Sequence, residues 1–83
     1  MKIYQIILYD KVKKKTTKIE DFPTLSMTAL KKRLSELQKG YCKGGEVPVV
    51  KEQEVSDGDF LIKALVATSD CDFCYIAPIN SFH

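Results

Sequence analysis

The chain has 83 residues, 45% of them hydrophobic and 29% charged, so we expect one small folded domain over residues 1–83 and exclude a disordered chain. The N-terminal apolar stretch is interrupted by Gln5, stops at Asp10 and has no small-residue cleavage site, which argues against a signal peptide. It is also too short to span a bilayer, so we expect no membrane partner. Three cysteines, an odd number, favour a reducing compartment over a disulfide framework and hence a cytoplasmic protein.

The net charge of +2 is distributed unevenly along the sequence. Residues 1–40 hold ten Lys or Arg and four Asp or Glu, whereas residues 41–83 hold three and seven. The first half is therefore basic and the second half acidic. Whether the two halves also separate in space depends on how their strands interleave.

The first two predicted elements are strands. Lys2–Tyr9 is rich in β-branched, aromatic and aliphatic side chains on both faces, which indicates a central strand covered on each side. A polar turn over residues 10–13 leads into a second strand over residues 14–19, "KKTTKI". Its lysines suit the edge of a sheet, because charged side chains discourage pairing with another chain.

The clearest element is a helix that begins after Pro23. Its apolar residues recur at steps of three and four and form one stripe, made by Met27, Leu30, Leu34, Leu37 and Tyr41. Ser26 is a suitable N-cap, because its hydroxyl oxygen can accept from an unpaired backbone N–H of the first turn. Gly40 is expected to end the helix in the left-handed conformation.

Three strands are predicted in the second half. A glycine-rich loop over residues 41–48 precedes a strand over residues 49–55 and a turn, "SDGD", over residues 56–59. Phe60–Ala67 is apolar on both faces, so periodicity does not separate a buried strand from a short buried helix. Its length and the turn residues around it favour a strand.

The last strand is expected over residues 73–79, where Pro78 suits an edge strand or a strand end. The order of elements is then β-β-α-β-β-β. The sequence predicts a small antiparallel sheet packed on one amphipathic helix, which is an α+β fold.

The cysteines raise the question of a zinc site. Cys71 and Cys74 stand three positions apart, but a tetrahedral site needs four ligands, and the other candidates are the isolated Cys42 and the terminal His83. If Cys74 lies in a strand, it points to the face opposite Cys71. We therefore predict no metal site and no cofactor, and a zinc-stabilised interaction module on these four residues is the weakest alternative.

No catalytic residue is predicted from the sequence. A nucleophile needs a base beside it, and the single histidine, His83, is the last residue, which is seldom held firmly. The sequence thus favours a role other than catalysis.

Lysine-rich segments are the main candidate binding feature. The predicted partner-binding residues are Lys11, Lys13, Lys14, Lys15, Lys18, Lys31, Lys32 and Arg33. Gathered in one exposed patch, they would attract an acidic protein surface, while neighbouring tyrosines and Phe73, some of them exposed, supply desolvated contacts. The same cations fit nucleic-acid binding, although the pI of about 8.4 is modest and no exposed aromatic residues are interleaved with them.

These observations predict a small protein-binding regulator or inhibitor that acts by charge-steered docking. Short, charged domains without motifs are of the kind that phages and mobile elements encode. Nucleic-acid binding through the lysine-rich hairpin is the alternative, and a homo-oligomer through a strand edge is compatible with both.

Overall fold

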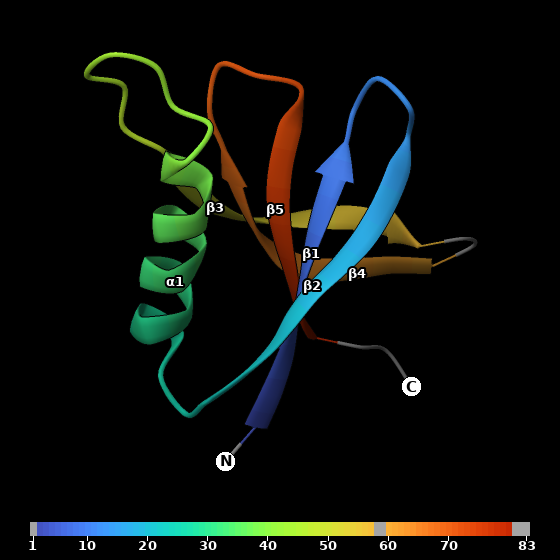
Figure 1. Ribbon diagram of the computed structural model, residues 1–83. Coiled ribbons are helices and arrows are strands. Elements are labelled where there is room, and N and C mark those ends of the chain that lie inside the picture. Colours follow the sequence, from blue (N-terminus) through green and yellow to red (C-terminus); the bar gives the residue numbers. More distant parts are fainter. Residues whose placement is uncertain (1, 58–59, 81–83) are drawn as a thin grey trace.

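The computed structural model describes residues 2–57 and 60–80, and it confirms the α+β fold (Figure 1). Five antiparallel strands form one sheet, and a single helix packs against it. The elements are β1 (Lys2–Asp10), β2 (Lys15–Thr24), α1 (Met27–Lys39), β3 (Val49–Asp57), β4 (Phe60–Thr68) and β5 (Phe73–Asn80). Phe60–Ala67 is thus part of a strand, as its length and flanking turns predict. Gly58 of the predicted turn lies outside the described residues.

The strand order in the sheet is β2-β1-β5-β4-β3. The lysine-rich β2 lies at an edge, as predicted, but runs to Thr24 because its residues pair with β1 over that whole length. β5 is central, with β1 on one side and β4 on the other. Pro78 therefore lies near the end of a central strand and not on an edge strand.

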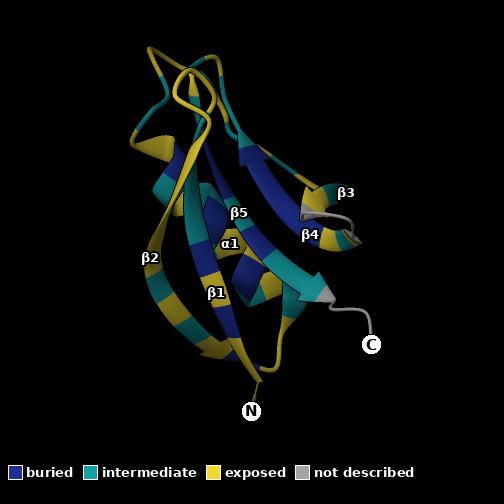
Figure 2. Cartoon of the chain, turned by 90° about the vertical axis from the view of Figure 1, so that its right-hand side faces the viewer, coloured by how far each residue is buried: buried dark blue, intermediate teal, exposed yellow. Residues whose placement is uncertain are grey.

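Helix α1 begins and continues as its sequence predicts. The Ser26 side chain accepts a hydrogen bond from the backbone N–H of Ala29 at 3.2 Å, so it is the N-cap. Leu30 and Leu34 have no exposed surface and pack against Ile6 and Leu65 of the sheet. Figure 2 shows this helix behind the buried parts of the sheet.

The helix ends at Gly40, as predicted, but the predicted left-handed conformation of this glycine is wrong. Gly40 has a φ of −62° and therefore remains right-handed, and its backbone N–H bonds to the last carbonyls of the helix. Among the described glycines, Gly44 is the one with a positive φ, at 59°, further along the loop. Because Gly44 adopts the left-handed conformation, the chain turns four residues later than a left-handed Gly40 would have made it turn.

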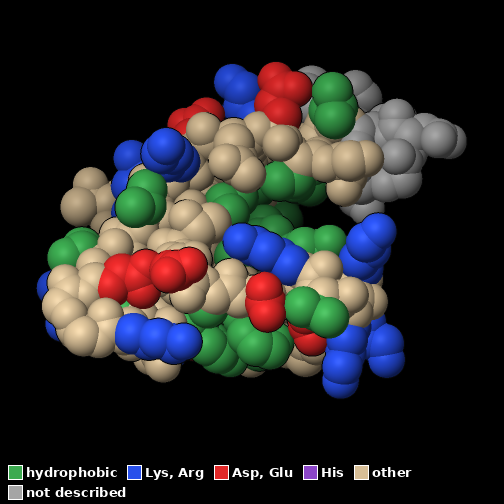
Figure 3. Space-filling view, turned by 90° about the horizontal axis from the view of Figure 1, so that it is seen from above, with side chains coloured by type: hydrophobic (Ala, Val, Ile, Leu, Met, Phe, Trp, Pro, Cys, Tyr) green, Lys and Arg blue, Asp and Glu red, His purple; other side chains and the backbone are tan. Residues whose placement is uncertain are grey.

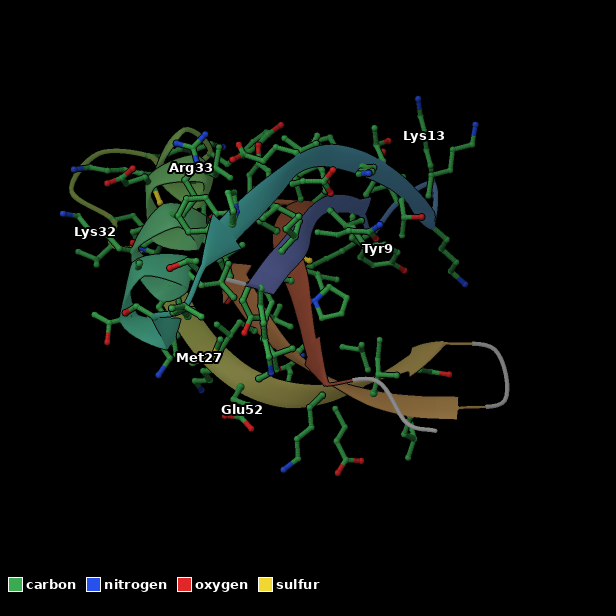
Figure 4. The ribbon with its side chains drawn as sticks, turned by 90° about the horizontal axis from the view of Figure 1, so that it is seen from below. Tyr9, Lys13, Met27, Lys32, Arg33 and Glu52 are labelled. Carbon is green, nitrogen blue, oxygen red and sulfur yellow. The ribbon has the colours of Figure 1, made fainter. Side chains whose placement is uncertain are left out.

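Two bulges bend the sheet. Ile19 is the unpaired extra residue of β2 opposite the junction of Ile6 and Ile7, and Ile79 is the extra residue of β5 opposite Lys63 and Ala64. A bulge increases the local twist of a strand pair. The β1–β2 and β3–β4 arms accordingly diverge on the side away from α1 (Figure 4).

Candidate functional site

The main candidate site is a groove of about 760 Å³ on the face of the sheet that points away from α1. We call this face the groove face. Strands β1, β3, β4 and β5 supply the apolar lining, which includes Ile7, Tyr9, Val55, Ile62, Val66 and Ile76. In the space-filling view from above, hydrophobic side chains form the floor of this hollow (Figure 3). The volume lies within the range of typical ligand pockets.

The groove corrects one expectation about β1. Residues of β1 alternate between the two faces, so Tyr4 and Ile6 pack under α1, whereas Ile7 and Tyr9 line the groove. Both faces are apolar, as the sequence indicates, but only one is covered by another element of the described chain. Half-buried apolar side chains such as Ile7 and Ile76 remain open to solvent.

The hairpin of β1 and β2 carries four lysines at one end of the groove, three in its turn and one at the start of β2. We call Lys11, Lys13, Lys14 and Lys15 the lysine tip; all four are exposed, and Lys11 also lines the groove. Within the described part of the chain, none of them has a carboxylate within 4.0 Å of its ammonium group. Their charge is therefore available to a partner.

Backbone contacts hold the lysine tip in place. The carboxylate of Asp10 accepts hydrogen bonds from the backbone N–H groups of Val12, at 2.9 Å, and Lys13, at 3.2 Å. The backbone N–H of Lys11 donates to the carbonyl of Asp72 at 2.8 Å, which ties the tip to the turn between β4 and β5. These bonds fix the position of the tip relative to the groove.

The other predicted cations do not join the lysine tip. Lys18 pairs with Asp21 at 3.2 Å along the exposed β2 edge. Lys31 and Lys32 are exposed on α1, and Figure 4 shows Lys32 at the opposite end of the molecule from Lys13. The predicted basic patch is therefore split into two separate groups.

Arg33 is occupied within the molecule. Its guanidinium donates two hydrogen bonds to Glu20, at 2.6 and 3.2 Å, and lies 3.8 Å from Glu36. The hydrogen bond to Glu20, opposed in part by desolvation, raises the pKa of Arg33. Arg33 therefore joins α1 to β2 and is a structural residue more than a partner-binding one.

Two of the three described cysteines, Cys42 and Cys71, lie near each other on the α1 side, but Cys74 lies apart from them. Cys74 is buried on the groove face beside Val66, whereas Cys71 bonds to the carbonyl of Phe73 at 3.1 Å on the α1 side. Cys42 donates to the carbonyl of Gln38 at 3.6 Å. Within residues 2–57 and 60–80 no cluster of His, Cys, Asp or Glu is arranged to hold a metal, and His83 lies outside them.

The cysteine in the groove is not activated. Burial raises the pKa of the Cys74 thiol, and the nearby ammonium of Lys11 only partly opposes that shift. Because the thiolate is the reactive form, Cys74 behaves as a small apolar residue of the groove wall.

Gln38 is a structural residue that the sequence analysis missed. Its side chain is fully buried, and its amide nitrogen donates to Ser69 Oγ at 2.7 Å and to the carbonyl of Phe73 at 2.9 Å. Its amide oxygen accepts from the backbone N–H of Tyr75 at 3.1 Å. Its position, four residues after Leu34 on the apolar face, is the signal that predicts its burial.

The aromatic residues are less exposed than expected. Tyr4 and Tyr75 are buried, and Tyr9, Tyr41 and Phe73 are half-buried. Tyr41 stacks on Phe73 with ring centroids 5.1 Å apart, which packs the loop after α1 onto β5. Of these five rings, only Tyr9 lines the groove.

Comparisons with known proteins give no relative for this chain: no family model matches it, and neither does any curated protein or solved structure. In the described residues, no helix has both the length and the apolar character that crossing a membrane requires.

Proposed function

We propose that this chain is a small protein-binding module, acting as a regulator or inhibitor, whose partner docks in the groove and is steered by the lysine tip. The observation that carries the proposal is an open apolar groove of about 760 Å³ with four exposed lysines at one end, none of which forms an ion pair within the described residues. A concave surface lined mainly by apolar side chains with a few polar groups is the usual form of a binding site.

The two features contribute in different ways. The apolar walls supply binding free energy when water leaves them, and Tyr9 is a large, rigid side chain of the type that dominates interfaces. The lysines attract a negative surface over a distance and accelerate the encounter. A partner with an apolar segment next to acidic residues uses both.

The chain offers a matched pair of variants for the test. Thr16 lines the groove, whereas Thr17 is the next residue of β2 and points to the other face; both are exposed. A Thr16→Trp ring should fill part of the groove, and Thr17→Trp should leave it open. Since aromatic residues are favoured in strands, neither change should prevent folding.

The experiment is an affinity capture from the native host with the wild-type protein and both variants, read by quantitative mass spectrometry. We expect a set of proteins that wild type and Thr17→Trp retain equally and that Thr16→Trp retains at least tenfold less. Retention of the same proteins at the same level by all three baits would contradict docking in the groove.

Nucleic-acid binding predicts a different outcome. The exposed lysines of the tip are the observation that favours it, since they can neutralise phosphates. A gel shift with random-sequence RNA at low salt would then depend on the four lysines of the tip and would be unaffected by Thr16→Trp. Under the protein-binding proposal, no shift occurs at physiological salt.

A further inference from the structure

We propose that the partner segment in the groove is an amphipathic α-helix with an acidic C-terminal end. This inference rests on the proposed function and specifies the form of the ligand. The helix would lay its apolar stripe on Ile7, Val66 and Ile76 and bring its acidic end to the lysine tip.

The hydrogen bonding of the sheet favours a helix over an extended segment. At the centre of the groove, where Ile7, Val66 and Ile76 lie, each strand is paired with a neighbour on both sides. Their backbone groups are therefore used within the sheet, and the groove presents side chains. An extended segment laid there would bury its own N–H and C=O groups without partners, whereas a helix satisfies them internally.

The length of the groove also fits a helix. β1 lines it from Gln5 to Lys11, which spans about 20 Å at roughly 3.3 Å per residue. A helix of about 13 residues has the same length at roughly 1.5 Å per residue. α1, which covers the opposite face of the same sheet, has 13 residues.

Electrostatics sets the direction of the helix. The C-terminal end of a helix carries a partial negative charge, and acidic side chains add to it. The lysine tip lies at one end of the groove, with Lys11 in its wall. The orientation with the C-terminal end at Lys11 is therefore the favourable one.

A second copy of this chain does not match these requirements. The only described helix, α1, has its apolar stripe buried against its own sheet and carries exposed Lys31, Lys32 and Lys39 on its outside. Placing α1 near the lysine tip would bring like charges together. Helix α1 of a second copy is therefore not the occupant of the groove.

The test is a selection of displayed random 20-residue peptides on the full-length protein, with Thr17→Trp as the second positive target and Thr16→Trp for counter-selection. We expect enriched peptides with apolar residues at steps of three and four and an excess of Asp and Glu toward the C-terminus. A proline placed in the middle of such a peptide should weaken binding at least tenfold, because it breaks the helix.

The outcomes separate the inference from the proposed function. Enriched apolar residues at steps of two, or tolerance of the central proline, would overturn the helix while leaving groove docking intact. Peptides that bind Thr16→Trp and Thr17→Trp equally would overturn groove docking itself. The helix is also overturned if no peptide is enriched. Binding of the fatty acid laurate to Thr17→Trp but not to Thr16→Trp would show that the groove takes a small apolar ligand. Dimerisation that Thr16→Trp abolishes would show that a second copy occupies the groove.

Discussion

Gln38 links three parts of the chain although it is uncharged. It joins the last turn of α1 to Ser69 in the turn before β5 and to the backbone of Phe73 and Tyr75 in β5. The pairing of β5 with β4 stops at Tyr75, so the amide of Gln38 occupies the position of a strand neighbour beside Phe73. A buried polar group with all its partners in place helps to specify one arrangement of helix and sheet.

Replacing Gln38 should be costly. Gln38→Met keeps the volume but removes three hydrogen bonds and takes away the acceptor of the buried Tyr75 N–H, so we expect the free energy of unfolding to fall by about 2–4 kcal/mol. Urea denaturation measures the change. The control is Gln53→Met on the exposed part of β3, which should alter stability by less than about 0.5 kcal/mol. Equal effects of the two substitutions would contradict the role of the buried network.

Lys14 is the only described residue other than glycine with a positive φ, at 55°. An L-residue with a Cβ is disfavoured there, and strained residues tend to occur at functional sites. Lys14→Gly should therefore raise the free energy of unfolding by about 0.5–1 kcal/mol, whereas Lys14→Ala, which keeps the Cβ, should leave it nearly unchanged. Thermal unfolding of the two variants compares them directly, and an identical stability would show that the turn carries no such strain.

At the scale of elements, α1 could be predicted well and the groove could not. The helix has a one-sided apolar stripe, an N-cap and a stop signal that agree with one another, and only the conformation of Gly40 differs. The strands β1, β4 and β5 are apolar on both faces. From the sequence, an apolar face that is covered by another element cannot be distinguished from one that is open to solvent. The divergence of the two arms depends on the bulges at Ile19 and Ile79, and their positions follow from long-range pairing.

The N-cap gives an element-level prediction. Ser26→Ala removes the acceptor for the Ala29 N–H and should lower the free energy of unfolding by about 1 kcal/mol. Thr28→Ala, on the exposed face of the same turn, should be neutral or slightly stabilising, because alanine has the higher helix propensity. Chemical denaturation of both variants is the measurement, and a loss with Thr28→Ala but not Ser26→Ala would refute the capping role.

At the scale of the whole molecule, the charge asymmetry of the sequence becomes an asymmetry in space. The strand order places β1 and β2 on one side of the central β5 and the acidic β3, with exposed Glu52 and Glu54, on the other. Part of the basic charge is neutralised within the molecule, because Lys18 and Arg33 form ion pairs with acidic side chains. The lysine tip remains as the unpaired basic group of the described residues at the groove. Its lysines are close together in the sequence and could be predicted, whereas their separation from Lys31 and Lys32 depends on the fold.

The most direct test of the groove as the binding surface is a map of amide chemical-shift changes when the ¹⁵N-labelled protein is titrated with a partner captured as described above. We predict the largest changes along the groove and its basic end, including Ile7, Lys11, Val55 and Ile76, and small changes on the outer face of α1 at Lys31 and Lys32. Large changes on that outer face, with the groove residues unchanged, would contradict the account.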